Sequence, residues 1–214
     1  RYMGGGYADG VNSGTTAVYV ALRALDLEPY TEIVVSPITD PGGIMPIVLL
    51  HCIPVVADAA PGRYNTGPEQ IKAVITQRTS AFLISHIGGE PSDIQGICAI
   101  ARQRGIPVIE DCSQAHGARL HGRLVGAFGD IAAFSTMFGK HHCTGGQGGM
   151  VFTKKESLYW SVRRMADRGK PFGLPSGVTN CVASLNFNMS EFGATIGRAQ
   201  LRKLSGIVKR RRAF

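Results

Sequence analysis

The chain has 214 residues, which is enough to bury a good core and is near the upper size of one domain. Hydrophobic residues make up 44% and charged residues 18%, a composition typical of a globular protein and too apolar for disorder. Much of the net charge of +8 lies in the closing stretch QLRKLSGIVKRRRAF, where cations suit a helix C-terminus, so we expect no nucleic-acid partner.

Short apolar runs rich in Val and Ile alternate with helical patterns along the chain. In chain order the expected strands are residues 32–37, 53–58, 80–86, 106–111, 130–136 and 149–154. The expected helices are residues 15–25, 67–77, 91–105 and 155–169, and a basic helix closes the chain. This alternation predicts an α/β fold, a mostly parallel sheet with helices on both faces. The Gly- and Pro-rich residues 168–181 are expected to form a surface loop.

The ends of the chain bear on whether it is part of a longer protein, and its hydropathy bears on its location. It begins without Met and ends inside a helical pattern, so we expect it to be part of a longer protein. No apolar run reaches membrane-spanning length and no signal peptide opens the chain. We therefore expect a cytoplasmic protein without a membrane partner.

Reactive side chains follow several of the expected strands. In doubly wound sheets ligands bind beyond the carboxyl ends of the strands. The residues found there are the TDPGG turn at 39–43, His86, Asp111 with Gln114, and Ser135 with Lys140.

The stretch VNSGTTAV places small and hydroxyl residues at the start of a helix. Ser13, Gly14, Thr15 and Thr16 could cradle a phosphate, because helix N-termini present free N–H groups and favour anions. The alternative is simple N-capping by Ser13 or Thr15. The spacing is not that of a phosphate-binding P-loop.

Strand 106–111 ends in two carboxylates, Glu110 and Asp111. A carboxylate at the end of an apolar strand needs a partner, since an unpaired buried charge is costly. The partner could be structural, in a salt bridge or helix cap, or it could be the cationic ring nitrogen of a cofactor. His116 could orient either carboxylate.

Lys140 lies between an apolar strand and a glycine-rich stretch, with His141, His142 and Cys143 directly after it. A metal site is not expected, because adjacent side chains point in different directions and no distant ligand motif completes the set. The five cysteines are scattered and form no C-x-x-C pair, which favours a reducing compartment. A lysine amine with a lowered pKa attacks carbonyl carbons. Together with an anion cradle and a carboxylate, this is what pyridoxal 5'-phosphate (PLP) requires of a protein.

Five motifs occur in the order NSGTTAV, IEDCSQAHGA, GDIAAFS, GGQGGMV and NFNMSEFGATIGRAQL. In this order they resemble the DegT/DnrJ/StrS sugar aminotransferases, which are fold-type I PLP enzymes. The resemblance implies that residues 1–214 form the large PLP-binding domain and that a smaller C-terminal domain is absent from this chain. It further implies a homodimer with a shared active site.

The resemblance also implies a role for each matching residue. Lys140 would be the Schiff-base lysine, Asp111 would pair with the pyridinium nitrogen, and Gln114 would contact the ring hydroxyl side. The residues expected to hold the phosphate are Thr15, Thr16 and Ser135, with Asn188, or alternatively Asn186, reaching the phosphate of the partner subunit.

The implied reaction is amination of a nucleotide-linked keto-sugar, or of a related cyclic ketone, with glutamate or glutamine as donor. One alternative is sugar dehydration, but the related 3-dehydratases carry His where this chain has Lys140. Another is a non-catalytic regulator, which the intact Lys140, Asp111 and Gln114 disfavour. A plain dinucleotide-binding domain is disfavoured by the absence of G-x-G-x-x-G.

Three positions differ from the family pattern. Asp40 and Gly88 stand where relatives often carry an aromatic residue, and Gln147 replaces a usual glutamate. We expect Asp40 and Gly88 to open space around the cofactor ring, with Asp40 either contacting substrate or capping the turn before Pro41.

Overall fold

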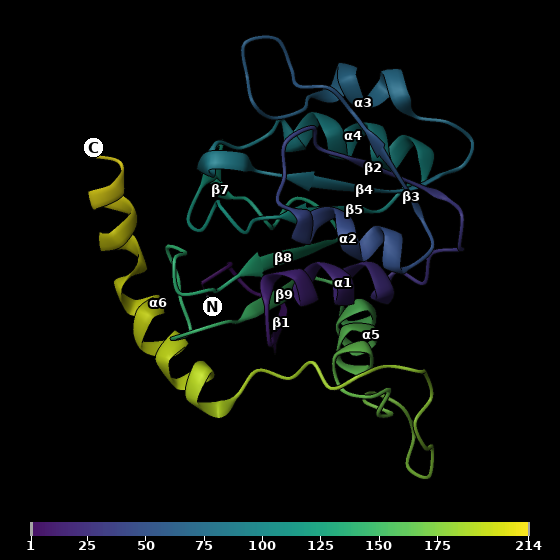
Figure 1. Ribbon diagram of the computed structural model, residues 1–214, viewed down its shortest axis with the longest axis vertical. Helices are drawn as coiled ribbons and strands as arrows, with labels where there is room; N and C mark the ends of the chain where they lie inside the picture. The colour runs from purple at the N-terminus through teal and green to yellow at the C-terminus, as the bar shows by residue number, and fades with distance from the viewer. Residues whose placement is uncertain (1, 214) are drawn as a thin grey trace.

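The computed structural model describes residues 2–213, and a seven-stranded sheet forms its centre (Figure 1). The strand order across the sheet is β3–β2–β4–β5–β8–β9–β1. Strands β3 to β8 are mutually parallel, whereas β9 runs antiparallel to both of its neighbours. The strand bounds are β1 (Tyr7–Val11), β2 (Glu32–Val35), β3 (Ile53–Val56), β4 (Thr79–Ser85), β5 (Val108–Asp111), β8 (Ile131–Ser135) and β9 (Gly149–Thr153). The mostly parallel sheet predicted from the sequence is confirmed.

Helices cover both faces of this sheet. Helices α1 (Gly14–Ala24), α2 (Pro41–Leu49) and α5 (Glu156–Ala166) pack on one face. Helices α3 (Pro68–Val74) and α4 (Ile94–Arg104) pack on the other. A short hairpin, β6 (Arg119–Leu120) and β7 (Arg123–Leu124), and a 3₁₀ turn, η1 (Ile87–Gly89), connect the central strands. Helix α6 (Glu191–Arg211) lies at the margin of the molecule.

The strands read as continuous apolar runs because both of their faces are buried. In β2, Ile33 and Val35 enter the core beneath α1, and Val34 enters the core on the α3 and α4 side. Strand β5 alternates in the same way, with Ile109 on the α1 side and Val108 on the other. Because of this alternation, Glu110 and Asp111 point to opposite faces of the sheet.

Helix α2, strand β1, the β6–β7 hairpin and the turn η1 were not predicted from the sequence. Helix α2 begins in the TDPGG stretch, which we interpreted as a turn; Pro41 is tolerated at the first helical position, where its missing N–H costs nothing. Strand β1 contains Gly and Asp and has no apolar run, but it pairs along its length with the edge of β9. The expected helix 67–77 ends at Val74, since Ile75 is extended.

The Gly- and Pro-rich stretch forms the surface loop that was expected. Residues 168–181 contain no regular helix or strand, and residues 173–181 are exposed. Among residues 2–213, no helix combines the length and the apolar character needed to cross a membrane.

Candidate active site

The reactive residues expected at strand ends do meet at one edge of the sheet. Ser85 at the end of β4 pairs in register with Asp111 at the end of β5. Ser135 at the end of β8 pairs with Gly149, where β9 begins. The N-terminus of α1 reaches this edge, because a Cβ on Gly14 would lie 2.5 Å from the Cβ of Ser135. The edge therefore combines a carboxylate, a hydroxyl and a helix N-terminus.

Asp111 is a buried carboxylate that forms no salt bridge in the described part of the chain. Its Oδ1 accepts a hydrogen bond from the backbone N–H of Ser113 at 3.0 Å. Its Oδ2 faces α2, where a Cβ on Gly43 would lie 3.6 Å away. Burial raises the pKa of Asp111, and Ser113, His86 and Lys140 partly offset this effect. Such a carboxylate is suited to a cationic partner that arrives with a ligand.

Glu110, the neighbouring carboxylate, is structural. It is fully buried and accepts from the backbone N–H groups of Gly126, Phe128 and Gly129 at 2.6–2.7 Å. Its fourth partner is His86, whose Nε2 lies 3.1 Å from Oε2. Burial alone would raise the pKa of Glu110, but these hydrogen bonds outweigh it, and the pKa is lowered.

His86, which the sequence left without a role, therefore orients Glu110, and the predicted partner His116 does not. The His86 Nδ1 accepts the backbone N–H of Ser92 at 3.1 Å, so Nε2 carries the proton and donates it to Glu110. His86, Glu110 and Cys112 have ligand-type atoms within 4.8 Å of one another. Both ring nitrogens and both carboxylate oxygens of this group are already used, so its geometry serves the fold.

The start of α1 combines helix capping with free donors. Ser13 is the N-cap, and its hydroxyl accepts the N–H of Thr16 at 3.1 Å. The Thr16 hydroxyl donates to Asn12 at 2.7 Å, which leaves it less available to a ligand than Thr15. The Ser135 hydroxyl accepts the N–H of Met137 at 3.4 Å and keeps its own proton free. The structure thus contains the Ser13 cap, and the binding of a phosphate at this helix start stays a prediction.

Lys140 lies at the tip of a loop that is closed at its base. Thr136 and Thr144 pair through their backbones at 2.9 Å, and their hydroxyls are also 2.9 Å apart. A Cβ on Gly148 would come within 2.2 Å of the Thr144 hydroxyl, so only glycine fits there. The Lys140 N–H donates to the carbonyl of Met137 at 2.9 Å, which turns the chain at this lysine. Lys140 is half-buried and lies close enough to Asp111 to favour its ionised form.

Gln114 joins Asp40 and Gly88, two of the three positions at which we expect the chain to depart from the family pattern. Its Oε1 accepts the backbone N–H of Gly88 at 3.0 Å, and its Nε2 donates to Oδ2 of Asp40 at 3.4 Å. Asp40 occupies the N-cap position of α2, but its side chain makes no capping hydrogen bond. The simple capping interpretation of Asp40 is therefore wrong.

Asn186 and Asn188 lie on an exposed segment that leads into α6. The Oδ1 of Asn186 accepts from both the backbone N–H and the side-chain amide of Asn188, at 3.2 and 2.8 Å. Residue 188 also forms a backbone bridge with Val11. The two amides act as one unit, and both side chains are accessible to another molecule.

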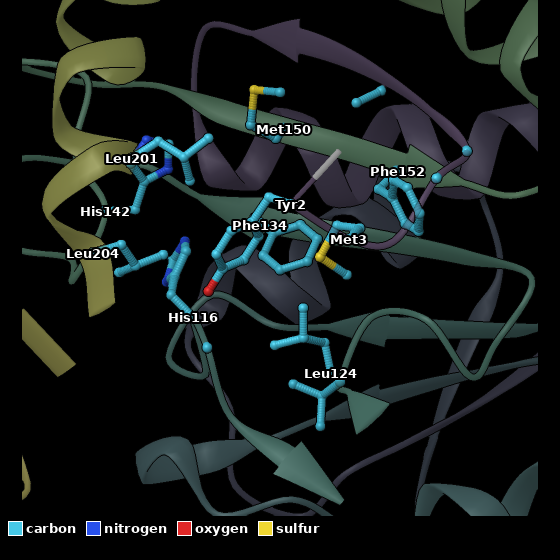
Figure 2. A pocket seen from close by; sticks show the side chains of 15 residues that line it. Tyr2, Met3, His116, Leu124, Phe134, His142, Met150, Phe152, Leu201 and Leu204 are labelled. Carbon is cyan, nitrogen blue, oxygen red and sulfur yellow. The ribbon is translucent and has the colours of Figure 1, made fainter. Parts of the chain in front are cut away.

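The histidines next to Lys140 line two cavities beside α6. His116 and His142 close one end of an apolar cavity of about 240 Å³, in which Leu201 and Leu204 of α6 face them (Figure 2). The Nε2 of His142 donates to the carbonyl of Gly197 at 3.0 Å. The rings of His116 and His142 line this cavity, and the histidines next to Lys140 form no metal-ligand group among the described residues.

A model of the DegT/DnrJ/EryC1/StrS aminotransferase family matches residues 1–214. The chain belongs to this family. It is 33% identical over 206 residues to the GDP-perosamine synthase of Escherichia coli O157:H7, covering 96% of the chain and 56% of that enzyme. The chain thus spans little more than half the length of such relatives.

Solved structures show the same fold. An aminotransferase from Psychrobacter cryohalolentis superimposes with a TM-score of 0.89 at 37% identity, covering 94% of this chain and 53% of that one. The E. coli GDP-4-keto-6-deoxy-D-mannose-3-dehydratase with bound hydrated PLP gives a TM-score of 0.88 at 26% identity, covering 95% and 58%. The fold is that of the PLP-dependent aminotransferases, as the motifs predicted.

Proposed function

We propose that residues 1–214 form the PLP-binding large domain of an aminotransferase. This cytoplasmic enzyme would move an amino group from glutamate or glutamine to a nucleotide-linked keto-sugar or a related cyclic ketone. The observation that supports this most strongly is the meeting of Lys140, the unpaired Asp111 and the N-terminus of α1 at one edge of the sheet.

The residues at this edge fit PLP. Asp111 is a buried carboxylate without a cation, and a protonated pyridine nitrogen would supply one. Thr15 and Ser135 offer free hydroxyls beside the first turn of α1, where a phosphate is favoured. Gly42 and Gly43 keep the approach open, because a Cβ on Gly42 would lie 2.6 Å from the Thr15 hydroxyl. When bound, PLP supplies a ring that accepts electrons from a carbon next to an amino nitrogen.

Each side chain at the site would then have a separate task. The Nζ of Lys140 would hold the cofactor covalently at rest and, when released, would take the proton from the α-carbon of the donor. Asp111 would keep its partner nitrogen protonated. Gln114, fixed by Gly88 and Asp40, would contact the hydroxyl side of the ring. Thr16 would add its hydroxyl to the phosphate cradle only after release from Asn12, because its backbone N–H is already donated to Ser13.

We also propose that the enzyme is a homodimer whose active site is shared. The exposed Asn188, with Asn186 as the alternative, would reach the phosphate bound by the partner subunit. The amide pair is held by its own hydrogen bonds and by the bridge to Val11, so it is ordered before a partner docks.

Trapping the cofactor on the lysine tests the proposal. Incubation of the full-length protein with PLP and borohydride should fix a pyridoxyl group on Lys140, and Lys140→Arg should remove the label. Labelling of a different lysine would refute the assignment. A screen of keto-sugars with glutamate then separates amination from dehydration, since amination leaves the nitrogen of the donor in the sugar product, whereas dehydration removes a hydroxyl from the sugar and leaves no nitrogen in it.

A further inference from the structure

A second cavity lies next to the candidate active site, between the C-terminal end of α6 and the turn that carries Gln114. Its volume is about 220 Å³. The residues that line it are Gly88, Gly89, Gln114, Ala115, His116, Ala118, His141, Val208, Arg211 and Arg212. Gln114 therefore borders this cavity. None of the residue roles proposed above gives the cavity itself a function.

Helix α6 directs a cation into this cavity from its packed face. Leu201 and Leu204 face the apolar cavity in Figure 2, and Val208 continues the same stripe at helical spacing. The next position on the stripe is Arg211, where an apolar residue would continue the packing. Its guanidinium contacts the carbonyl of Gly139, with Nη2 at 3.5 Å, one residue before Lys140. Arg211 thus lies over the loop that carries Lys140.

The positive charge at this place is not neutralised within residues 2–213. None of the ion pairs in that range includes Arg211 or Arg212. No residue in the cavity lining is acidic. The carboxylate of Asp40 contacts Gln114 but does not line the cavity. Two guanidinium groups without a carboxylate, beside Lys140, produce a local excess of positive charge that attracts anions.

Two histidines that line the same cavity carry buried hydrogen-bonding atoms without a partner. Both ring nitrogens of His116 are buried and have no partner in the described chain, and the same is true of Nδ1 of His141. Burial lowers the pKa of His116 to about 3, so its ring is neutral and carries one N–H donor. Buried polar atoms are usually satisfied, so unpaired nitrogens beside two free guanidinium groups indicate a missing acceptor.

We propose that Arg211, Arg212 and His116 form a binding site for a doubly charged anionic group of the substrate. This assignment rests on the proposed function, because the cavity adjoins the ring through Gln114. Two substrates would present such a group: the diphosphate of a nucleotide-linked sugar, and the two carboxylates of glutamate. In both cases the guanidinium groups would supply charge-assisted hydrogen bonds from α6.

Calorimetric titration of the full-length, PLP-loaded protein with inorganic pyrophosphate and, separately, with glutarate tests the site. Loading with PLP fills the phosphate cradle at α1, so that pyrophosphate cannot bind there. Arg211→Gln should weaken binding about tenfold or more, since hydrogen bonds to charged groups are among the strong ones. Arg211→Lys should keep part of the affinity. The matched control is Arg210→Gln, which removes the same charge from the neighbouring residue, whose guanidinium lies along its own helix near Gly206.

The two titrations distinguish the sources. A loss confined to pyrophosphate assigns the site to the diphosphate, and a loss confined to glutarate assigns it to the amino donor. Equal losses in Arg211→Gln and Arg210→Gln, or no anion binding to a protein that holds PLP, would overturn the site. A protein that takes no PLP but loses anion binding in Arg211→Gln would instead overturn the proposed function and leave the anion site standing.

Discussion

Neutralising the two adjacent carboxylates of β5 should change stability in opposite directions. Glu110→Gln keeps the size of the side chain but replaces one acceptor oxygen with an NH₂ group. Each Glu110 oxygen accepts two hydrogen bonds, so the amide would face two N–H donors that lose their acceptor. At about 1–3 kcal/mol for each orphaned donor, the expected loss is about 2–6 kcal/mol. Because folding lowers the pKa of Glu110, its ionised carboxylate stabilises the fold at pH values above the ordinary pKa of 4.5. The loss of stability in Glu110→Gln should therefore shrink as the pH falls below 4.5.

Asp111→Asn should have the reverse effect in the cofactor-free protein. Burial raises the pKa of Asp111 above its ordinary value of 3.8, so the native wild-type protein loses stability as the pH rises through the raised pKa. The asparagine variant avoids that loss, and its Oδ1 can still accept the Ser113 N–H. We expect it to match or exceed the wild type at neutral pH by about 1.4 kcal/mol for each unit of pKa shift, with no gain below pH 3.8.

Urea denaturation of both variants from acidic to neutral pH, without PLP, measures these free energies of unfolding. Addition of PLP provides the functional control, since Asp111→Asn should weaken turnover severely and Glu110→Gln should affect it only through stability. If Asp111→Asn destabilises the cofactor-free protein at neutral pH as much as Glu110→Gln does, Asp111 is a structural carboxylate. The reasoning about the active site would then be wrong.

Three further changes probe single contacts. Gly149→Ala would place a Cβ 2.2 Å from the carbonyl oxygen of Ser13, so it should lower the free energy of unfolding by about 1–3 kcal/mol and weaken PLP binding. Gly146→Ala, which adds a Cβ in open space, should change neither quantity. His116→Phe should flatten the loss of stability between about pH 6.5 and pH 3, because His116 is protonated in that range only when unfolded; urea melts at each pH check this. Asp40→Ala should reduce turnover while leaving PLP affinity, measured by fluorescence, nearly unchanged; a variant that only melts earlier would exclude a role in catalysis.

The parts of the fold that could be predicted were those in which burial alone sets the pattern. The central strands are apolar on both faces and α1 carries a Ser cap, so local sequence and tertiary structure agree. Helix α2 and strand β1 were missed because their local signals are those of turns. Gly42 permits close approach to Thr15, a contact between distant segments that no local pattern contains.

The candidate site, like the fold, could be predicted from the sequence only in part. The strand-end rule correctly placed Asp111, Ser135 and Lys140 at one edge, because parallel strands present their carboxyl ends together. It could not tell which carboxylate of the Glu110–Asp111 pair faces α1, because that depends on the register of β5. Nor could it find that His86, rather than His116, orients Glu110, since both histidines follow strands and only three-dimensional packing brings one of them within 3.1 Å.

Asp40 and Gly88, which the sequence presents as two separate departures from the family, are one feature in the structure. Gly88 has a φ of 66°, a conformation that side chains rarely adopt, and a Cβ there would meet nothing within 4 Å. The backbone conformation therefore favours glycine at this position. Its N–H fixes Oε1 of Gln114, which turns the amide nitrogen toward Asp40. The other N–H of that amide remains available beside the cavity that Arg211 enters. A ligand at this edge would thus meet a preoriented polar group, and we expect this group to favour a substrate with hydroxyl or anionic groups over a flat apolar one.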